Sequence, residues 1–171
     1  SSLRSVTTTS TPISSLIDYL LSLQQNIRWI DGLPHFSYRD VLSILNHRYV
    51  YQTAPDVISQ RIREIVTNNR LWMAPEELAN TPWLEKLFSY RQEAAGFANY
   101  LLDVLGELNR QLEELESANE VEQEFIFHYF ALVNRLRGVM QESGPFLSRA
   151  NRSPACRSWA CWRRVRLTLI G

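Results

Sequence analysis

Apolar residues between positions 94 and 115 recur at alternating spacings of four and three residues. A repeat of 3.5 residues keeps one apolar line facing a neighbouring helix along its whole length. The pattern therefore predicts a long helix over about 82–116 that starts at Thr81 and Pro82 and packs lengthwise against another helix. The residues of this line are Ala94, Ala98, Leu101, Leu105, Leu108, Leu112 and Leu115.

Shorter apolar patterns with the spacing of a helix precede this segment. Each follows a residue that can cap a helix, or has a proline in its first turn, and each has one apolar face. They predict three further helices, over about 12–28, 38–48 and 54–69.

The segments between these helices carry turn-forming residues. Asp31, Gly32 and Pro34 are expected to end the first helix. Residues 49–52 are β-prone but have no partner strand at hairpin distance, so we expect a loop there, with a short strand as the alternative. Residues 75–78 are expected to form one helical turn.

A change of phase separates the long helix from the last one. Ser117 and Glu120 have the spacing of a capping box, and the apolar pattern resumes after them and continues to about residue 142. Either one helix continues through an irregularity, or the chain reverses into an antiparallel hairpin. We favour the hairpin because the capping residues and the phase change coincide.

The last helix is apolar around much of its circumference. Phe125, Ile126, Phe127, Phe130 and Val133 point in several directions, and one neighbouring helix covers only one side of them. Either the rest of the bundle or another subunit must cover the other side, and we favour a subunit interface because Phe127 lies opposite the hairpin seam. The fold expected from all these patterns is all-α, a bundle of about five helices with a long C-terminal antiparallel helical hairpin.

Composition is that of one globular domain. Hydrophobic residues make up 45% of the 171 residues and charged residues 21%, and no apolar run reaches the ~18 residues of a membrane span. The numbering opens on Ser1 without a basic and apolar leader, which suggests a processed chain or a fragment. We divide the sequence into a flexible lead-in at 1–11, a helical domain at 12–142 and a basic, Arg/Trp-rich tail at 143–171.

Charge separates the helical domain from the tail. Residues 143–171 hold six arginines and no acid, whereas all 18 acids lie before them. The only lysine is Lys86, and this excess of arginine is typical of GC-rich genomes, so we consider a viral origin. Two interpretations of the tail stay open: a native basic tail, or a non-native terminus translated out of frame or derived from a vector.

Residues that could carry chemistry are scattered. His35, His47 and His128 have no common spacing, and no catalytic, phosphate-binding or zinc motif occurs. Cys156 and Cys161 both lie in the tail, which favours a reducing intracellular compartment over a disulfide scaffold. We therefore expect no enzyme activity, no cofactor and no metal.

The resulting hypothesis is a non-enzymatic helical module for protein interaction or assembly, a scaffold that self-associates as a homo-oligomer or docks a partner helix through a coiled coil. Acidic residues between 113 and 124 could bind a basic partner, but we interpret them as the solvated rim of a hairpin tip. The expected partner-binding residues are Leu101, Leu105, Leu108, Leu112, Leu115, Phe125, Phe127, Phe130 and Val133.

The alternative hypothesis is nucleic-acid binding. Residues 38–69 resemble a helix-turn-helix in order, although the joint between the two helices is long, and the tail adds further arginines. An acidic helical domain would repel a polyanion, so we disfavour this function. Its candidate contacts are Arg61, Arg63, Arg70, Arg163, Arg164 and Arg166.

Overall fold

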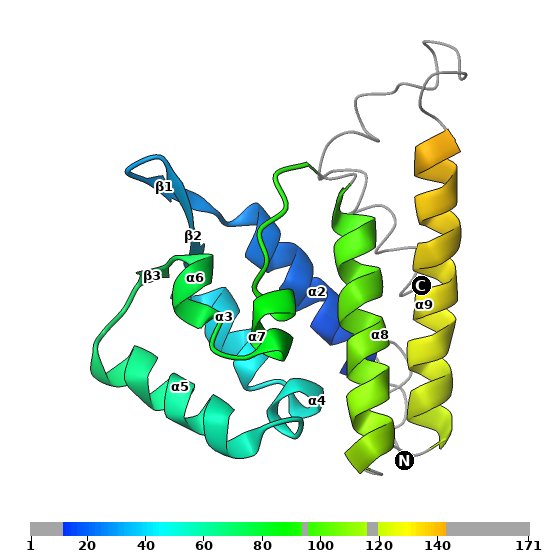
Figure 1. Cartoon of the computed structure of the whole chain (residues 1–171), viewed down its shortest axis with the longest axis horizontal. Helices are drawn as coiled ribbons and strands as arrows, with labels where there is room; N and C mark the ends of the chain where they lie inside the picture. Colours follow the sequence, from blue (N-terminus) through cyan, green and yellow to red (C-terminus); the bar gives the residue numbers. More distant parts are fainter. Residues whose placement is uncertain (1–11, 94–95, 116–119, 143–171) are drawn as a thin grey trace, which may run out of the picture.

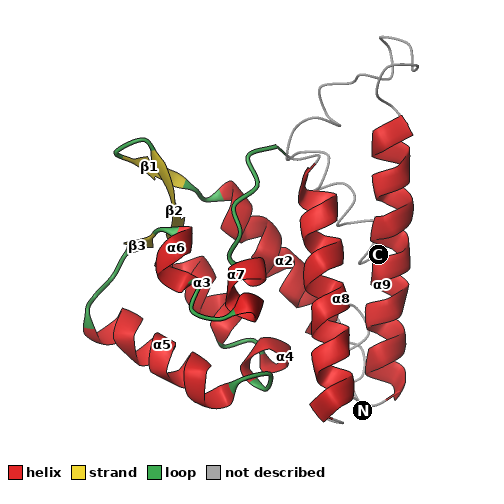
Figure 2. Cartoon of the chain, in the orientation of Figure 1, coloured by secondary structure: helices red, strands yellow, loops and turns green. Residues whose placement is uncertain are grey.

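The computed structural model describes residues 12–93, 96–115 and 120–142, and it is mostly helical, as predicted (Figures 1 and 2). Ala94, residues 1–11, the joint at 116–119 and the tail at 143–171 lie outside the described residues. Within the described part, the helices are α2 (Pro12–Gln25), α3 (Tyr38–Leu45), α4 (Arg48–Tyr51), α5 (Pro55–Thr67), α6 (Pro75–Leu78), α7 (Pro82–Leu87), α8 (Phe97–Leu115) and α9 (Glu120–Glu142).

A small antiparallel sheet is the main element that the sequence patterns did not predict. Its strands are β1 (Arg28–Ile30), β2 (Leu33–Ser37) and β3 (Trp72–Met73), in the order β1-β2-β3. Asp31 and Gly32 both have positive φ, the geometry of a two-residue hairpin turn. Helix α2 already ends at Gln25, before these residues, so Asp31 and Gly32 do not end it as expected but reverse the chain between β1 and β2.

Residues 49–52 are also different from the prediction. The expected loop, or short strand, is the one-turn helix α4 and its C-terminal cap. The backbone N–H of Tyr49 donates to Nδ1 of His47 at 3.2 Å, so His47 caps this helix. A histidine cap is not among the common cap residues, which is why the pattern did not reveal it.

The predicted helix over 82–116 is wrong in its first half. The chain leaves α7 at Phe88 and α8 begins only at Phe97. The hydroxyl of Tyr100 donates to the carbonyl of Leu87 at 2.5 Å, which satisfies one of the carbonyls at the end of α7. Trp83 and Leu87 on α7 are nevertheless buried in the same core as the apolar residues of α8.

Helices α8 and α9 lie side by side and run in opposite directions (Figure 1). Arg137 near the end of α9 donates to Asn99 near the start of α8 at 3.4 Å, and a Cβ added at Gly106 would lie 3.6 Å from the ring of Phe130. This arrangement excludes one continuous helix through 82–142. The pair forms one edge of the molecule, and α3 to α7 and the sheet lie on the far side of α2 and α8 (Figure 1).

One hydrophobic core joins all these elements. It extends from Ile13 on α2 to Val133 on α9, and it includes the whole described apolar line of α8 as far as Leu112. The heptad pattern therefore predicted the buried face of α8 correctly, and that face packs within this chain. Helix α9 adds Ile126 and Tyr129 to the core and leaves its opposite face exposed.

Candidate functional site

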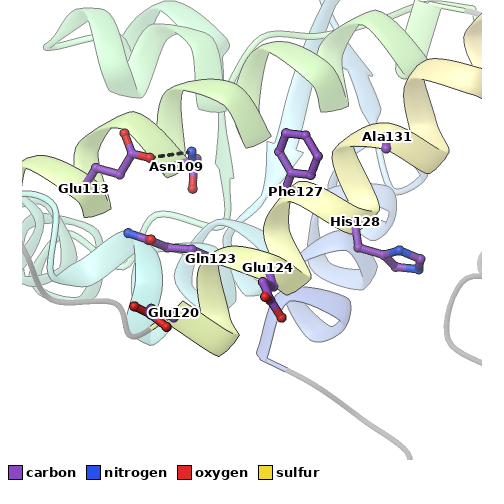
Figure 3. Close-up of a pocket in the computed structure, with 8 residues that line it drawn as sticks. All are labelled: Asn109, Glu113, Glu120, Gln123, Glu124, Phe127, His128 and Ala131. Atoms are coloured by element: carbon purple, nitrogen blue, oxygen red, sulfur yellow. Dashed lines mark hydrogen bonds between the residues drawn. The ribbon is translucent and has the colours of Figure 1, made fainter.

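An open groove runs along the outer side of the α8–α9 pair and has a volume of about 550 Å³. Two of its residues come from α8 and six from α9 (Figure 3). We call this feature the α8–α9 groove, and it is lined by Asn109, Glu113, Glu120, Gln123, Glu124, Phe127, His128 and Ala131.

Phe127 is the apolar feature of the groove. Its side chain is 70% exposed, whereas its neighbour Ile126 is buried in the core. Successive helix positions are about 100° apart, so α9 can bury Ile126 against α8 and still present Phe127 outward. Because burying an aromatic side chain contributes roughly 1.5–3 kcal/mol, an exposed Phe127 is a ready anchor for a second surface.

The charge of the groove is negative. Glu113, Glu120 and Glu124 line it, and none of its eight lining residues is a lysine or an arginine. Arg110 projects from another side of α8, where it pairs with Glu107 and Glu114. The cation nearest in sequence to Glu113 is thus engaged elsewhere.

On the opposite flank of α8, acidic and basic side chains pair with each other, unlike the glutamates of the α8–α9 groove. A smaller hollow of about 350 Å³ there contains Lys86, Glu107 and Arg110. Burial alone would raise the pKa of Glu107, but hydrogen bonds from Arg110 and Gln111 and the charge of Arg110 outweigh it and lower the pKa. Glu107 in that hollow pairs with both Lys86 and Arg110, whereas the glutamates of the α8–α9 groove have no lysine or arginine among the lining residues.

Asn109 adds an unused acceptor to the wall of the groove. Its Nδ2 donates to Oε1 of Glu113 at 3.4 Å (Figure 3), but its Oδ1 is shielded from solvent and has no hydrogen-bond partner in the described part of the chain. A buried acceptor without a partner costs free energy, so Asn109 is a polar but unsatisfied part of the groove wall.

The other predicted partner residues fall into two groups. Those of the leucine line and Val133 are fully buried in the core and support the fold of this chain, and Phe130 is half-buried against the same core. Leu115 and Phe125 stay 46% and 40% exposed. The first group comprises Leu101, Leu105, Leu108 and Leu112, and none of these leucines is accessible to a partner in this structure.

The residues predicted to contact nucleic acid are not gathered on one free surface. Arg61 pairs with Glu64 at 2.9 Å and Arg70 pairs with Glu77, while Arg63 is exposed. Helix α4 stands between α3 and α5, so these helices are not joined by a simple turn. The remaining candidates, Arg163, Arg164 and Arg166, lie outside the described residues.

Ser15 and His47 are in contact, but the ring nitrogen of His47 that faces the serine carries the proton, which is unsuitable for catalysis. Oγ of Ser15 lies 3.3 Å from Nε2 of His47, but Nδ1 of His47 accepts the Tyr49 N–H. In the neutral ring Nε2 therefore carries the proton and donates to Ser15, so His47 cannot act as a base toward that hydroxyl. Among the described residues, no group of three His, Cys, Asp or Glu is placed to hold a metal ion.

The sequence patterns pointed to the acidic residues of this groove but not to Asn109. Glu113, Glu120 and Glu124 stood out as acidic positions, but we interpreted them as a solvated rim. The contribution of Asn109 depends on how α8 and α9 pack together, and no sequence pattern placed Asn109 beside Phe127.

Comparison of the chain with protein-family models, curated proteins and solved structures found no match. None of the described helices is long and apolar enough to cross a bilayer.

Proposed function

We propose that this chain is a non-enzymatic, helical protein-interaction module and that the α8–α9 groove is its docking surface. The observation that carries the proposal is the exposed ring of Phe127 within an open groove. Central aromatic anchors surrounded by polar residues are typical of protein interfaces, where a few such side chains supply most of the affinity.

The negative charge of the groove favours a positively charged partner over a second copy of the same groove. In a symmetric contact between two copies, the same patch faces itself, so Glu113, Glu120 and Glu124 would meet their own counterparts. Like charges placed opposite one another oppose association. We therefore prefer a basic partner segment with an apolar anchor to a face-to-face homo-oligomer.

Peptide selection tests this function. A displayed library of random peptides would be selected on the immobilised full chain, and the recovered peptides would then be tested on Phe127→Ala. We expect enriched peptides with Arg or Lys near an aromatic or large aliphatic residue, and we expect Phe127→Ala to weaken their binding at least tenfold.

Val66→Ala is the matched control, because Val66 is a 62% exposed apolar residue on α5, away from the groove. Binding should survive this substitution unchanged. Peptides that bind Phe127→Ala as tightly as the parent chain, or a selection that enriches none, would contradict the proposed function.

A further inference from the structure

The α8–α9 groove has a candidate occupant within the same chain. Beyond Glu142, residues 143–171 carry six arginines and no acid, together with Trp159 and Trp162. The groove carries three glutamates, no lysine or arginine, and the exposed ring of Phe127. Charge and aromatic content are therefore complementary between the two.

We propose that residues 143–171 bind intramolecularly in the α8–α9 groove, with arginines at Glu113, Glu120 and Glu124 and a tryptophan against Phe127. The inference rests on the proposed function, since it names the segment that covers the docking surface and that an external partner must displace. Arginine suits these carboxylates because its planar guanidinium can pair with both oxygens at once.

The length of the tail allows this contact. Phe127 lies fifteen residues before Glu142, or about 22 Å along the helix axis. Arg149 is seven residues beyond Glu142, and seven extended residues span about 23 Å. Residues from Arg149 onward thus have enough reach for Phe127, and the later part of the tail has enough length to place Trp159 or Trp162 against Phe127 and arginines at Glu124 and Glu120.

Tethering favours this contact over one between two molecules. A peptide tether of this length gives an effective concentration on the order of 1 mM, far above an ordinary protein concentration. A weak site with Kd of about 0.1 mM would then be roughly nine-tenths occupied within each molecule. Association of separate molecules through the same contact would need a similarly high protein concentration.

The exposed carboxylates of the groove supply the contacts for the tail. Oδ1 of Asn109 has no hydrogen-bond partner in the described part of the chain. That atom is shielded from solvent, so the contact with the tail rests on the exposed carboxylates and not on this amide. The same contact would lose strength in salt, because the three carboxylates lie at an open surface.

Photo-crosslinking of the full chain tests the proposal. Phe127→p-benzoylphenylalanine keeps an aromatic ring at the anchor position, and the same replacement at His128 provides a second probe in the groove. Equal amounts of ¹⁴N and ¹⁵N protein would be mixed before irradiation, so that mass spectrometry separates crosslinks within one molecule from those between two. Val66→p-benzoylphenylalanine is the control at a remote exposed site.

We expect crosslinks from the groove to residues 143–171 that contain a single isotope. The triple variant Glu113→Gln, Glu120→Gln, Glu124→Gln should reduce their yield at least fivefold. An equal change of net charge elsewhere, Glu76→Gln, Glu85→Gln, Glu93→Gln, should leave it unchanged.

Mixed-isotope crosslinks, no crosslink to residues 143–171 from either groove probe, or an equal yield from position 66 would overturn the inference. These outcomes are distinguishable from failure of the proposed function. Peptides that depend on Phe127 would still be selected if only the tail contact were wrong.

Discussion

The backbone N–H of Arg91 donates a hydrogen bond to Oε1 of Gln24 on α2, at 2.9 Å. Nε2 of Gln24 donates to the carbonyl of Ser89 at 2.7 Å. One buried amide thus supplies both partners for a backbone segment that has left the helical hydrogen-bond pattern. This contact explains how the chain can break between α7 and α8 without leaving those two polar groups unsatisfied.

Replacing Gln24 with leucine should therefore destabilise the fold. Two backbone groups would lose their partners, each at a cost of about 1–3 kcal/mol. The control is Gln25→Leu, the same chemical change one residue along, where Nε2 is already buried without a hydrogen-bond partner in the described chain. Urea unfolding should show a loss of about 2–6 kcal/mol for Gln24→Leu and little or no loss for Gln25→Leu. Equal losses would contradict the role assigned to Gln24.

The second prediction concerns alkaline pH. Burial raises the pKa of Tyr49 to about 12, and the carboxylate of Glu122 on α9 adds to this rise against the opposing effect of Arg48. The pKa of Tyr49 in the folded chain therefore lies above its ordinary value near 10. Neutral Tyr49 thus contributes to the free energy of unfolding in full below pH 10, and this contribution is lost as the pH rises through 12.

Tyr49→Phe should remove that part of the pH dependence, so its unfolding free energy should fall less than that of the parent chain between pH 10 and 12. Tyr51→Phe is the control, because Tyr51 is more exposed and its hydroxyl lies 2.5 Å from Oγ of Ser59 on α5. Denaturant unfolding at a series of pH values measures the difference. Parallel pH profiles for Tyr49→Phe and the parent chain would refute the prediction.

Two glycines should respond in opposite directions to alanine. Gly32 has φ of +77° in the hairpin turn, so Gly32→Ala should cost about 1–2 kcal/mol through backbone strain. Gly106 lies inside α8, and an added Cβ would make an ordinary contact at 3.6 Å with Phe130, so Gly106→Ala should add up to about 1 kcal/mol. Thermal melts would measure both, and a shift of the same sign for the two variants would contradict the structure.

Local sequence patterns were sufficient for the regular helices. The apolar spacing of α2 and α8 identified their buried faces, because one period decides which side chains share a face. On α5 the pattern was right only in part, since Ile58 and Ile65 are buried whereas Val57 and Val66 are exposed. The Asp31–Gly32 pair carried a strong hairpin signal as well, but we interpreted it only as the end of a helix. The hairpin was therefore predictable in principle.

The features that the sequence did not reveal depend on residues far apart in the chain. The break after α7 needs Gln24, which lies 65 positions before Ser89. The groove likewise depends on how two helices pack together. The sequence placed Phe127 opposite the hairpin seam, and its side chain is exposed, but the periodicity of the helices did not place Asn109 and Glu113 of α8 beside it.

Phe127 and Ile126 provide an internal comparison of surface and core. Phe127→Ala should change the unfolding free energy by no more than about 0.5 kcal/mol, because its side chain is mostly exposed. Ile126→Ala should cost about 2–5 kcal/mol, because it empties a fully buried site. Chemical denaturation of both variants checks this, and a large loss for Phe127→Ala would place that ring in the core instead of on a docking surface.

The most direct test of the docking surface is a fluorescence-anisotropy titration of one selected peptide against the full chain. The parent, Phe127→Ala, Val66→Ala and the triple glutamine variant of Glu113, Glu120 and Glu124 would be compared at low and high salt. We expect at least tenfold weaker binding for Phe127→Ala, weaker and less salt-dependent binding for the triple variant, and no change for Val66→Ala. Equal affinity across all four proteins would contradict the claim that the α8–α9 groove binds the partner.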